Sequence, residues 1–202
     1  MTTVAAPPGA ALGPGFFARD VGTVAEELVG CLLACGPAAG VIVEVERYQQ
    51  DDPASHSFRG PRGRAAVMFG PPGRLYVYRS YGMHWCMNLV CEPEGRGAAV
   101  LLRALQPTAG LEIMRARRGG RVPDRTLCAG PGRLTQALGV DGGFDGLPLA
   151  GSGEEGVAVL ARPGPVPLLY GPRVGISRAV ERPWRIGLAG SPYLSRPFRE
   201  RP

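Results

Sequence analysis

The sequence contains no lysine, and all 23 of its basic residues are arginine. A lysine side chain is the usual amine nucleophile in enzymes that form a Schiff base. This protein therefore has no side chain that would ordinarily supply the amine for that chemistry. Arginine keeps its positive charge at any working pH and binds phosphate through a planar fork of donors. With a net charge of +6 and a pI near 9.4, the composition favours an anionic partner such as nucleic acid.

Histidine is scarce, and the cysteines are scattered. The only histidines are His56 and His84, and the five cysteines are dispersed: Cys31, Cys35, Cys86, Cys91 and Cys128. A structural zinc site needs four such ligands at close spacing, and a disulfide framework is typical of small secreted chains. We therefore expect buried free thiols, a reducing compartment, and neither a metal nor another cofactor.

Long apolar runs are absent as well. No stretch approaches the roughly 20 residues of a membrane-spanning helix, and the opening MTTVAAPPGAALGPG lacks the basic segment of a secretory signal. We expect a cytoplasmic protein with no membrane partner and with flexible tails at 1–15 and 197–202. The 202 residues, 45% of them hydrophobic, suffice for a core within one domain at 16–196.

The order of apolar runs and turn residues predicts a compact, mostly β domain. A helix capped by Asp20 or Thr23 extends to about residue 30, and two more helices are predicted at 110–118 and 132–138. Strands are predicted at 31–35, 40–48, 74–80, 83–91, 98–105, 156–162, 172–176 and 183–189. Segments rich in proline, glycine and polar residues predict loops at 51–64, 117–125 and 161–172.

The strand GVIVEVERY carries two carboxylates on one face. At a period of two residues, Glu44, Glu46 and Tyr48 project to one side, and the valines between them project to the other. Two neighbouring carboxylates can serve as acid and base in the hydrolysis of a glycosidic bond. A solvated strand face explains the same spacing, and the spacing alone favours it.

The segment LYVYRSYGMHWCMN at 75–88 contains four aromatic residues, although aromatic residues make up only 7% of the chain. Tyrosine and tryptophan favour strands, so most of these rings are expected in the core. The corner Arg79-Ser-Tyr-Gly82 differs, because it places Tyr81 at a protruding turn where the ring has nothing to pack against. An exposed ring beside an arginine is suited to insertion between stacked bases.

Two further polar residues have both a structural and a functional interpretation. His56, in the loop DPASHS, either caps a turn or contacts a ligand, and a loop histidine taken alone is more often structural. Arg103 ends the apolar run AAVLL, where a charge needs a partner. That partner is a pocket carboxylate or a phosphate, unless Arg103 lies at the surface.

Several motifs in a fixed order resemble a known family. The segments are "VEVERY", "DDPASHSFRG", "MFGPPGRLYVYRSYGMHWCMN", "AVLLRALQP", "CAGPGRLTQAL", "RVGIS" and "GSPYLS". Together, over about residues 16–195, they resemble the alkyladenine (3-methyladenine) DNA glycosylases of the mammalian alkyladenine-glycosylase type. The resemblance implies a single domain of mixed α/β (α+β) class. Its fold is a curved antiparallel sheet with short surrounding helices and a protruding β-hairpin that inserts into DNA.

The resemblance also implies a reaction. A monofunctional DNA glycosylase of base excision repair flips a damaged purine out of duplex DNA and hydrolyses its N-glycosidic bond with a glutamate-activated water. The expected substrates are 3-methyladenine, 7-methylguanine, hypoxanthine and ethenoadenine, and the product is an abasic site. We expect double-stranded DNA with damaged purines as the partner, a monomeric protein, and no lyase step because lysine is absent.

Individual residues match the functional positions of that family. Glu46 matches the general base, and Arg103 matches the arginine that helps to hold the attacking water. The base pocket is expected at Tyr48, His56, Tyr78 and Asn88, the last of which would crowd the exocyclic amine of guanine. Tyr81 matches the ring that fills the place of the flipped base. Contacts with the DNA backbone are expected at Arg59, Arg62, Arg64, Arg79 and Arg133.

Some positions depart from the family pattern. Arg47 stands where alanine is usual, His84-Trp85 replaces a Tyr-Phe pair, and the interval from Tyr48 to His56 is one residue shorter than in the mammalian form. Two other functions stay open: a nucleic-acid-binding module on the same scaffold without catalysis, and a carbohydrate glycosidase that uses Glu44 and Glu46. The basic charge and the tyrosine hairpin disfavour the carbohydrate glycosidase.

Overall fold

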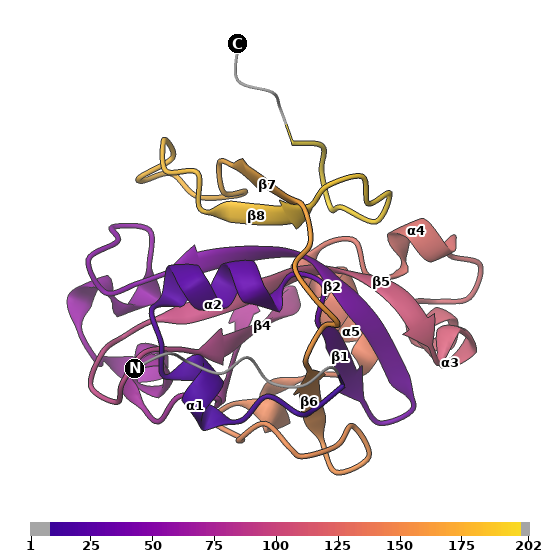
Figure 1. Ribbon diagram of the computed structural model, residues 1–202, viewed down its shortest axis with the longest axis horizontal. Helices are drawn as coiled ribbons and strands as arrows, with labels where there is room; N and C mark the ends of the chain where they lie inside the picture. The colour runs from indigo at the N-terminus through magenta and orange to yellow at the C-terminus, as the bar shows by residue number, and fades with distance from the viewer. Residues whose placement is uncertain (1–8, 199–202) are drawn as a thin grey trace.

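Two long strands form the middle of one curled antiparallel sheet in the computed structural model, which describes residues 9–198 (Figure 1). Along the sheet the strand order is β3 (Leu75–Ser80), β4 (His84–Val90), β5 (Ala99–Ala109), β2 (Ala38–Tyr48), β1 (Leu32–Cys35) and β6 (Val157–Leu160). β8 (Arg185–Leu188) pairs with β2 and with β7 (Leu168–Gly171). The expected fold class, a mixed α/β domain around a curved antiparallel sheet, is confirmed.

Short helices lie around this sheet. The α-helices are α1 (Pro14–Phe17), α2 (Val21–Leu28), α3 (Leu111–Arg117), α4 (Asp124–Leu127) and α5 (Pro131–Leu138), and the 3₁₀ helices are η1 (His56–Arg59), η2 (Gly63–Phe69) and η3 (Gly142–Phe144). Asp20 is the N-cap of α2, because its side chain accepts a hydrogen bond from the Thr23 amide at 3.0 Å. Within residues 9–198, no helix is both long and apolar enough to cross a membrane.

The core explains why residues 42–46 in the middle of β2 are buried on both faces. Phe17 and Leu28 come from the N-terminal helices, Ile42 and Leu102 from the two long strands, and Leu134 from α5, and none of these side chains has exposed surface. Each buried side chain of this size contributes about 1.5–3 kcal/mol through the hydrophobic effect. Polar groups on β2 therefore lie inside the protein and need partners there.

One predicted strand was wrong. The segment 172–176 forms no strand, and β7 lies just before it, within the stretch that we predicted as a proline-rich loop. The first strand residue follows Pro167, so the prolines precede the pairing with β8 and do not interrupt it. The amide of Val174 is used by the Glu46 side chain and not by a neighbouring strand.

Residues within both predicted tails contact the rest of the domain. The amides of Gly9 and Leu12 donate to carbonyl oxygens on β6 and immediately after it, at 2.9 and 2.8 Å. The ring of Phe198 packs against β8, with its centre 3.8 Å from a guanidinium carbon of that strand. The ends of the expected tails, residues 1–8 and 199–202, lie outside the described residues.

The cysteines are all buried and unpaired, as expected. Burial raises the pKa of each thiol, to about 12 for Cys128. The thiols are therefore neutral at physiological pH and act as small apolar groups in the core.

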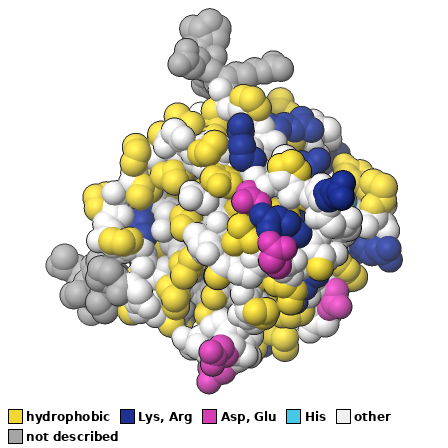
Figure 2. Space-filling view, turned by 90° about the vertical axis from the view of Figure 1, so that its right-hand side faces the viewer, with side chains coloured by type: hydrophobic (Ala, Val, Ile, Leu, Met, Phe, Trp, Pro, Cys, Tyr) yellow, Lys and Arg dark blue, Asp and Glu magenta, His cyan; other side chains and the backbone are white. Residues whose placement is uncertain are grey.

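The face that carries α3 and α4 mixes both signs of charge. In Figure 2, arginine side chains lie directly beside acidic ones near the centre of this face. Arg115 on α3 pairs with Glu112 and with Asp124. The positive charges on this face are thus partly neutralised by acidic neighbours.

Candidate active site

One row of cross-strand partners defines the face on which the site lies. Tyr76 on β3 is opposite Asn88 on β4, Asn88 is opposite Leu101 on β5, and Leu101 is opposite Glu46 on β2. Residues directly opposite each other in a sheet project to the same side. Positions two residues away along each strand share that side, so Tyr48, Tyr78, Arg103 and Glu44 belong to the same face.

Glu46 is a fully buried carboxylate, and both of its oxygens accept hydrogen bonds. Oε1 accepts from the Val174 amide at 2.7 Å, and Oε2 accepts from the Tyr48 hydroxyl at 2.8 Å. Burial raises the pKa of the Glu46 carboxyl, although the Arg103 charge and both hydrogen bonds oppose this shift. A carboxylate with a raised pKa is a stronger base, so Glu46 is suited to accept a proton from water.

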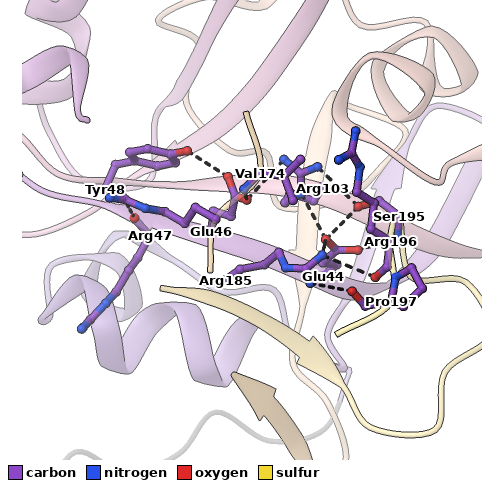
Figure 3. Close-up of polar contacts among 11 residues, drawn as sticks. Glu44, Glu46, Arg47, Tyr48, Arg103, Val174, Arg185, Ser195, Arg196 and Pro197 are labelled. Atoms are coloured by element: carbon purple, nitrogen blue, oxygen red, sulfur yellow. Dashed lines mark hydrogen bonds and ion pairs between the residues drawn. The ribbon is translucent and has the colours of Figure 1, made fainter. Parts of the chain in front are cut away.

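One guanidinium group lies between Glu46 and Glu44 (Figure 3). Arg103 donates from Nε to Glu44 Oε1 at 3.1 Å, and its Nη1 lies 3.4 Å from Glu46 Oε1. Burial alone would lower the pKa of Arg103, but the two carboxylates raise it overall, so the group stays charged. The partner that Arg103 needs at the end of AAVLL is therefore a pair of carboxylates.

Glu44 is also fully buried, and four donors hold it (Figure 3). Besides Arg103, Oε1 accepts from Arg185 Nη1 at 3.2 Å and from the Ser195 hydroxyl at 2.8 Å. Oε2 accepts from the Ser195 amide at 2.5 Å. The interpretation of Glu44 and Glu46 as a solvated strand face is wrong, because neither residue has exposed surface.

A cavity of about 680 Å³ opens beside these charges. All four predicted pocket residues line it, together with Arg103: Tyr48, His56, Tyr78 and Asn88. Glu46 lies behind the lining and contacts three of its members, Tyr48, Arg103 and Val174. The cavity volume falls within the roughly 300–1,000 Å³ that is common for ligand sites, and its walls are aromatic and polar.

His56 is held in one tautomer at this cavity. Nδ1 lies 2.8 Å from the Tyr76 hydroxyl, and Nε2 lies 3.3 Å from Arg64 Nη2. A guanidinium can only donate, so Nε2 accepts and the proton of the neutral ring is assigned to Nδ1. The residue as a whole is exposed, yet partial burial of the side chain and, second, the Arg64 charge lower the pKa of His56 to about 4. His56 is therefore uncharged at neutral pH.

The turn between β3 and β4 places an aromatic ring in solvent. Tyr81 is 81% exposed, and its φ of 49° is a left-handed conformation that non-glycine residues rarely adopt. Tyr81 also borders the cavity, so the exposed ring and the cavity belong to one surface. Insertion of Tyr81 into DNA stays a prediction.

The arginines that we predicted to contact the DNA backbone are all exposed: Arg59, Arg62, Arg64, Arg79 and Arg133. Arg64 and Arg79 line the cavity. The Arg64 guanidinium also lies over the Tyr78 ring, with its carbon 5.0 Å from the ring centre. Arg64 and Arg79 are therefore placed where a phosphate backbone that passes the cavity would meet them, and the contacts of all five arginines with DNA stay a prediction.

Arg47 points away from Glu46, to the side of β2 that α2 covers (Figure 3). Its guanidinium carbon lies 4.4 Å from the centre of the Trp184 ring, and its Nη1 lies close to Gly22 of α2. The departure from alanine therefore places no charge directly beside Glu46.

Asp52 and Arg173 form a buried ion pair behind Tyr48. Neither side chain has exposed surface, and Arg173 Nη2 donates to Asp52 Oδ1 at 3.0 Å while Nη1 donates to Oδ2. The Arg173 guanidinium carbon lies 4.6 Å from the centre of the Tyr48 ring. The pair thus joins the loop before His56 to the segment that carries Val174.

Comparisons with known proteins show the family of the chain. The family model for "Methylpurine-DNA glycosylase (MPG)" matches residues 15–192. The chain belongs to the methylpurine-DNA glycosylase family. Proteins of Rhodopseudomonas palustris strain HaA2 and of Nitrosospira multiformis are 54% and 53% identical over 97% and 91% of this chain, and over 98% and 93% of their own length. Both relatives are provisionally named 3-methyladenine DNA glycosylases.

The methylpurine-DNA glycosylase match confirms the family that the sequence motifs predicted, and it spans every predicted site residue. Four further residues of the site were not predicted from the sequence: Tyr76, Val174, Arg185 and Ser195. Tyr76 lies two residues before Tyr78 on the same face of β3, so a period of two would have found it. Val174 binds through its backbone amide, as does Ser195 in part, and such contacts leave no signal in a pattern of side chains.

The buried pair behind Tyr48 generates a prediction about stability. Asp52→Asn leaves the Arg173 charge buried without its carboxylate, which typically costs about 3–5 kcal/mol in the free energy of unfolding. Denaturant titration of the purified variant measures this loss. Glu112→Gln makes the same chemical change at an exposed ion pair and should leave the free energy of unfolding unchanged within error. Equal stability of both variants would contradict a structural role for Asp52.

Proposed function

We propose that the protein is a monofunctional DNA glycosylase that removes alkylated or deaminated purines from double-stranded DNA. The observation that carries the proposal is the buried carboxylate of Glu46, which lies behind a tyrosine-lined cavity that is bordered by the exposed Tyr81. Membership of the methylpurine-DNA glycosylase family and the names of the relatives support it. The proposed substrates are 3-methyladenine, 7-methylguanine, hypoxanthine and ethenoadenine.

In the proposed reaction, Glu46 accepts a proton from a water molecule while the oxygen of that water bonds to C1′ of the sugar. The bond between C1′ and the base nitrogen breaks, and its electron pair leaves with the base. A purine that is cationic through alkylation leaves as a neutral molecule, and hypoxanthine or ethenoadenine takes up a proton from solvent as it leaves. The carboxylate also stabilises the positive charge that develops on the sugar. Arg103, at 3.4 Å from Glu46, orients the carboxylate and the water. The products are a free base and an abasic site in an intact strand.

Access to the bond requires base flipping, because water cannot reach a purine that is stacked in a duplex. Extrusion costs a few kcal/mol, and least for a damaged or mispaired base. We propose that Tyr81 offsets this cost by filling the vacated place in the stack. Tyr48, His56 and Tyr78 enclose the flipped base. Asn88, whose Nδ2 donates to the Tyr76 carbonyl at 2.9 Å, is held where it would crowd the amine of guanine.

Glu46→Gln tests directly whether Glu46 is the general base. The amide keeps the shape of the side chain but removes the proton acceptor and the negative charge, so single-turnover excision should fall at least ~10²-fold. Affinity for lesion-containing duplex should be retained. Glu94→Gln, the same change at an exposed site, is the control and should excise at the normal rate. Near-normal excision by Glu46→Gln would remove Glu46 from its proposed role.

Tyr81→Ala tests flipping. Without the ring, excision should fall more for a lesion in a stable pair than for the same lesion in a mismatch, because the mismatched base is already partly unstacked. Rates on both duplexes are measured in single turnover, and Tyr170→Ala, at another exposed tyrosine, is the control. An equal loss on both duplexes would assign Tyr81 to the fold.

The missing lysine generates a prediction about the mechanism. A lyase step needs an amine that forms a Schiff base with the sugar, and this chain contains no lysine side chain. Borohydride added during turnover should therefore trap no covalent protein–DNA adduct, whereas a bifunctional glycosylase treated alike should be trapped. A trapped adduct that carries the lesion strand would overturn the water mechanism and point to the N-terminal amine.

A further inference from the structure

Glu44 is a buried charge that the proposed reaction does not use. It is absent from the cavity lining, and the only lining residue to which it bonds is Arg103. Burying a carboxylate costs several kcal/mol unless charged partners compensate for it. A neutral side chain could fill a purely structural role at this position at a lower cost in free energy. The negative charge of Glu44 therefore needs an explanation.

Arg103 does not bind its two carboxylates equally. Its contact with Glu44 is a hydrogen bond from Nε at 3.1 Å, whereas its contact with Glu46 is an ion pair at 3.4 Å. Glu44 is in turn fixed by Arg185 and by both donors of Ser195, so it cannot move toward or away from Arg103 freely. The fixed Glu44 carboxylate therefore holds the Arg103 guanidinium in its position (Figure 3).

The charges around Glu46 balance only when Glu44 is included. Charged and titratable groups reach Glu46 from four strands: Glu44 and Tyr48 on β2, Arg103 on β5, Arg185 on β8 and Cys86 on β4. Tyr48 and Cys86 are neutral at physiological pH, because burial raises the pKa of both. Two carboxylates thus face two guanidinium groups. Removal of one carboxylate would leave both cations to act on Glu46.

We propose that Glu44 is a positioning residue that keeps Glu46 basic by holding Arg103 and neutralising part of its charge. The proposal rests on the proposed function, in which Glu46 is the base. Without the Glu44 charge, the Arg103 guanidinium would turn fully to Glu46, stabilise its carboxylate form and make it a weaker base. The electrostatics agree in direction: burial is the main cause that raises the pKa of Glu46, the Arg103 charge and two hydrogen bonds lower it, and the Glu44 charge raises it by the smallest of these effects.

The test is the pH profile of single-turnover excision by Glu44→Gln. Excision by the unsubstituted protein falls as pH drops through the pKa of Glu46, since the protonated carboxyl cannot accept a proton. In Glu44→Gln the pKa of Glu46 is lower, so the acid limb of the profile, where the rate falls with falling pH, moves to lower pH. The rate on the plateau at higher pH also falls, because Glu46 is then a weaker base. The ratio of variant to unsubstituted rate should rise roughly threefold or more between pH 8 and pH 5. Glu94→Gln should keep the limb in place.

A second variant guards against loss of folding. Glu44→Gln/Arg185→Met removes one charge of each sign, so the cluster stays neutral and Arg103 is left with Glu46 alone. This double variant should shift the acid limb in the same direction, but less than Glu44→Gln does, because only one guanidinium group then acts on Glu46. An unchanged limb, or unfolding of both variants by circular dichroism, would overturn the proposal and leave Glu44 a structural residue. Absence of excision by the unsubstituted protein would overturn the proposed function as well, which separates the two failures.

Discussion

The Arg103 guanidinium, shared by two buried carboxylates, is the interaction on which the rest of the site depends. Glu44 and Glu46 have no exposed surface, and Arg103 and Arg185 retain only 5% and 3%. None of these charges is tolerable in the interior alone, and each is compensated by the others. Their partners are far apart in sequence, since Glu44 and Arg185 are separated by 141 positions. The cluster therefore forms only when the sheet is complete.

The order of the strands explains how a cavity with such walls arises. β3, β4, β5 and β2 are adjacent, and each contributes to one face: Tyr78, Asn88, Arg103 and Glu46. The hairpin of β3 and β4 continues beyond this face and ends in Tyr81, so the exposed ring and the cavity are parts of one continuous element. One sheet thereby carries both Tyr81, the residue proposed to enter DNA, and Glu46, the proposed general base.

Much of this arrangement was predictable from local pattern, and some was not. A period of two correctly placed Glu44, Glu46 and Tyr48 on one face, and the motifs predicted the family. The pattern wrongly suggested a solvated face, because the compensating groups lie 59 to 151 positions away, on Arg103, Arg185 and Ser195. The strand at 172–176 failed for a related reason. In that segment the Val174 amide donates a hydrogen bond to the Glu46 side chain, and hydrophobic periodicity does not predict such a contact.

The most direct test of the account uses a labelled duplex with one hypoxanthine, and a matched duplex with one 3-methyladenine, incubated with the unsubstituted protein. Each reaction is divided, and one half is treated with hot alkali to cleave abasic sites. The proposed glycosylase activity predicts an intact strand before alkali and cleavage at the lesion after it, with undamaged purines untouched. Tight binding with an alkali-stable strand across both lesions would contradict it, and would make the protein a nucleic-acid-binding module that retains the scaffold without the reaction.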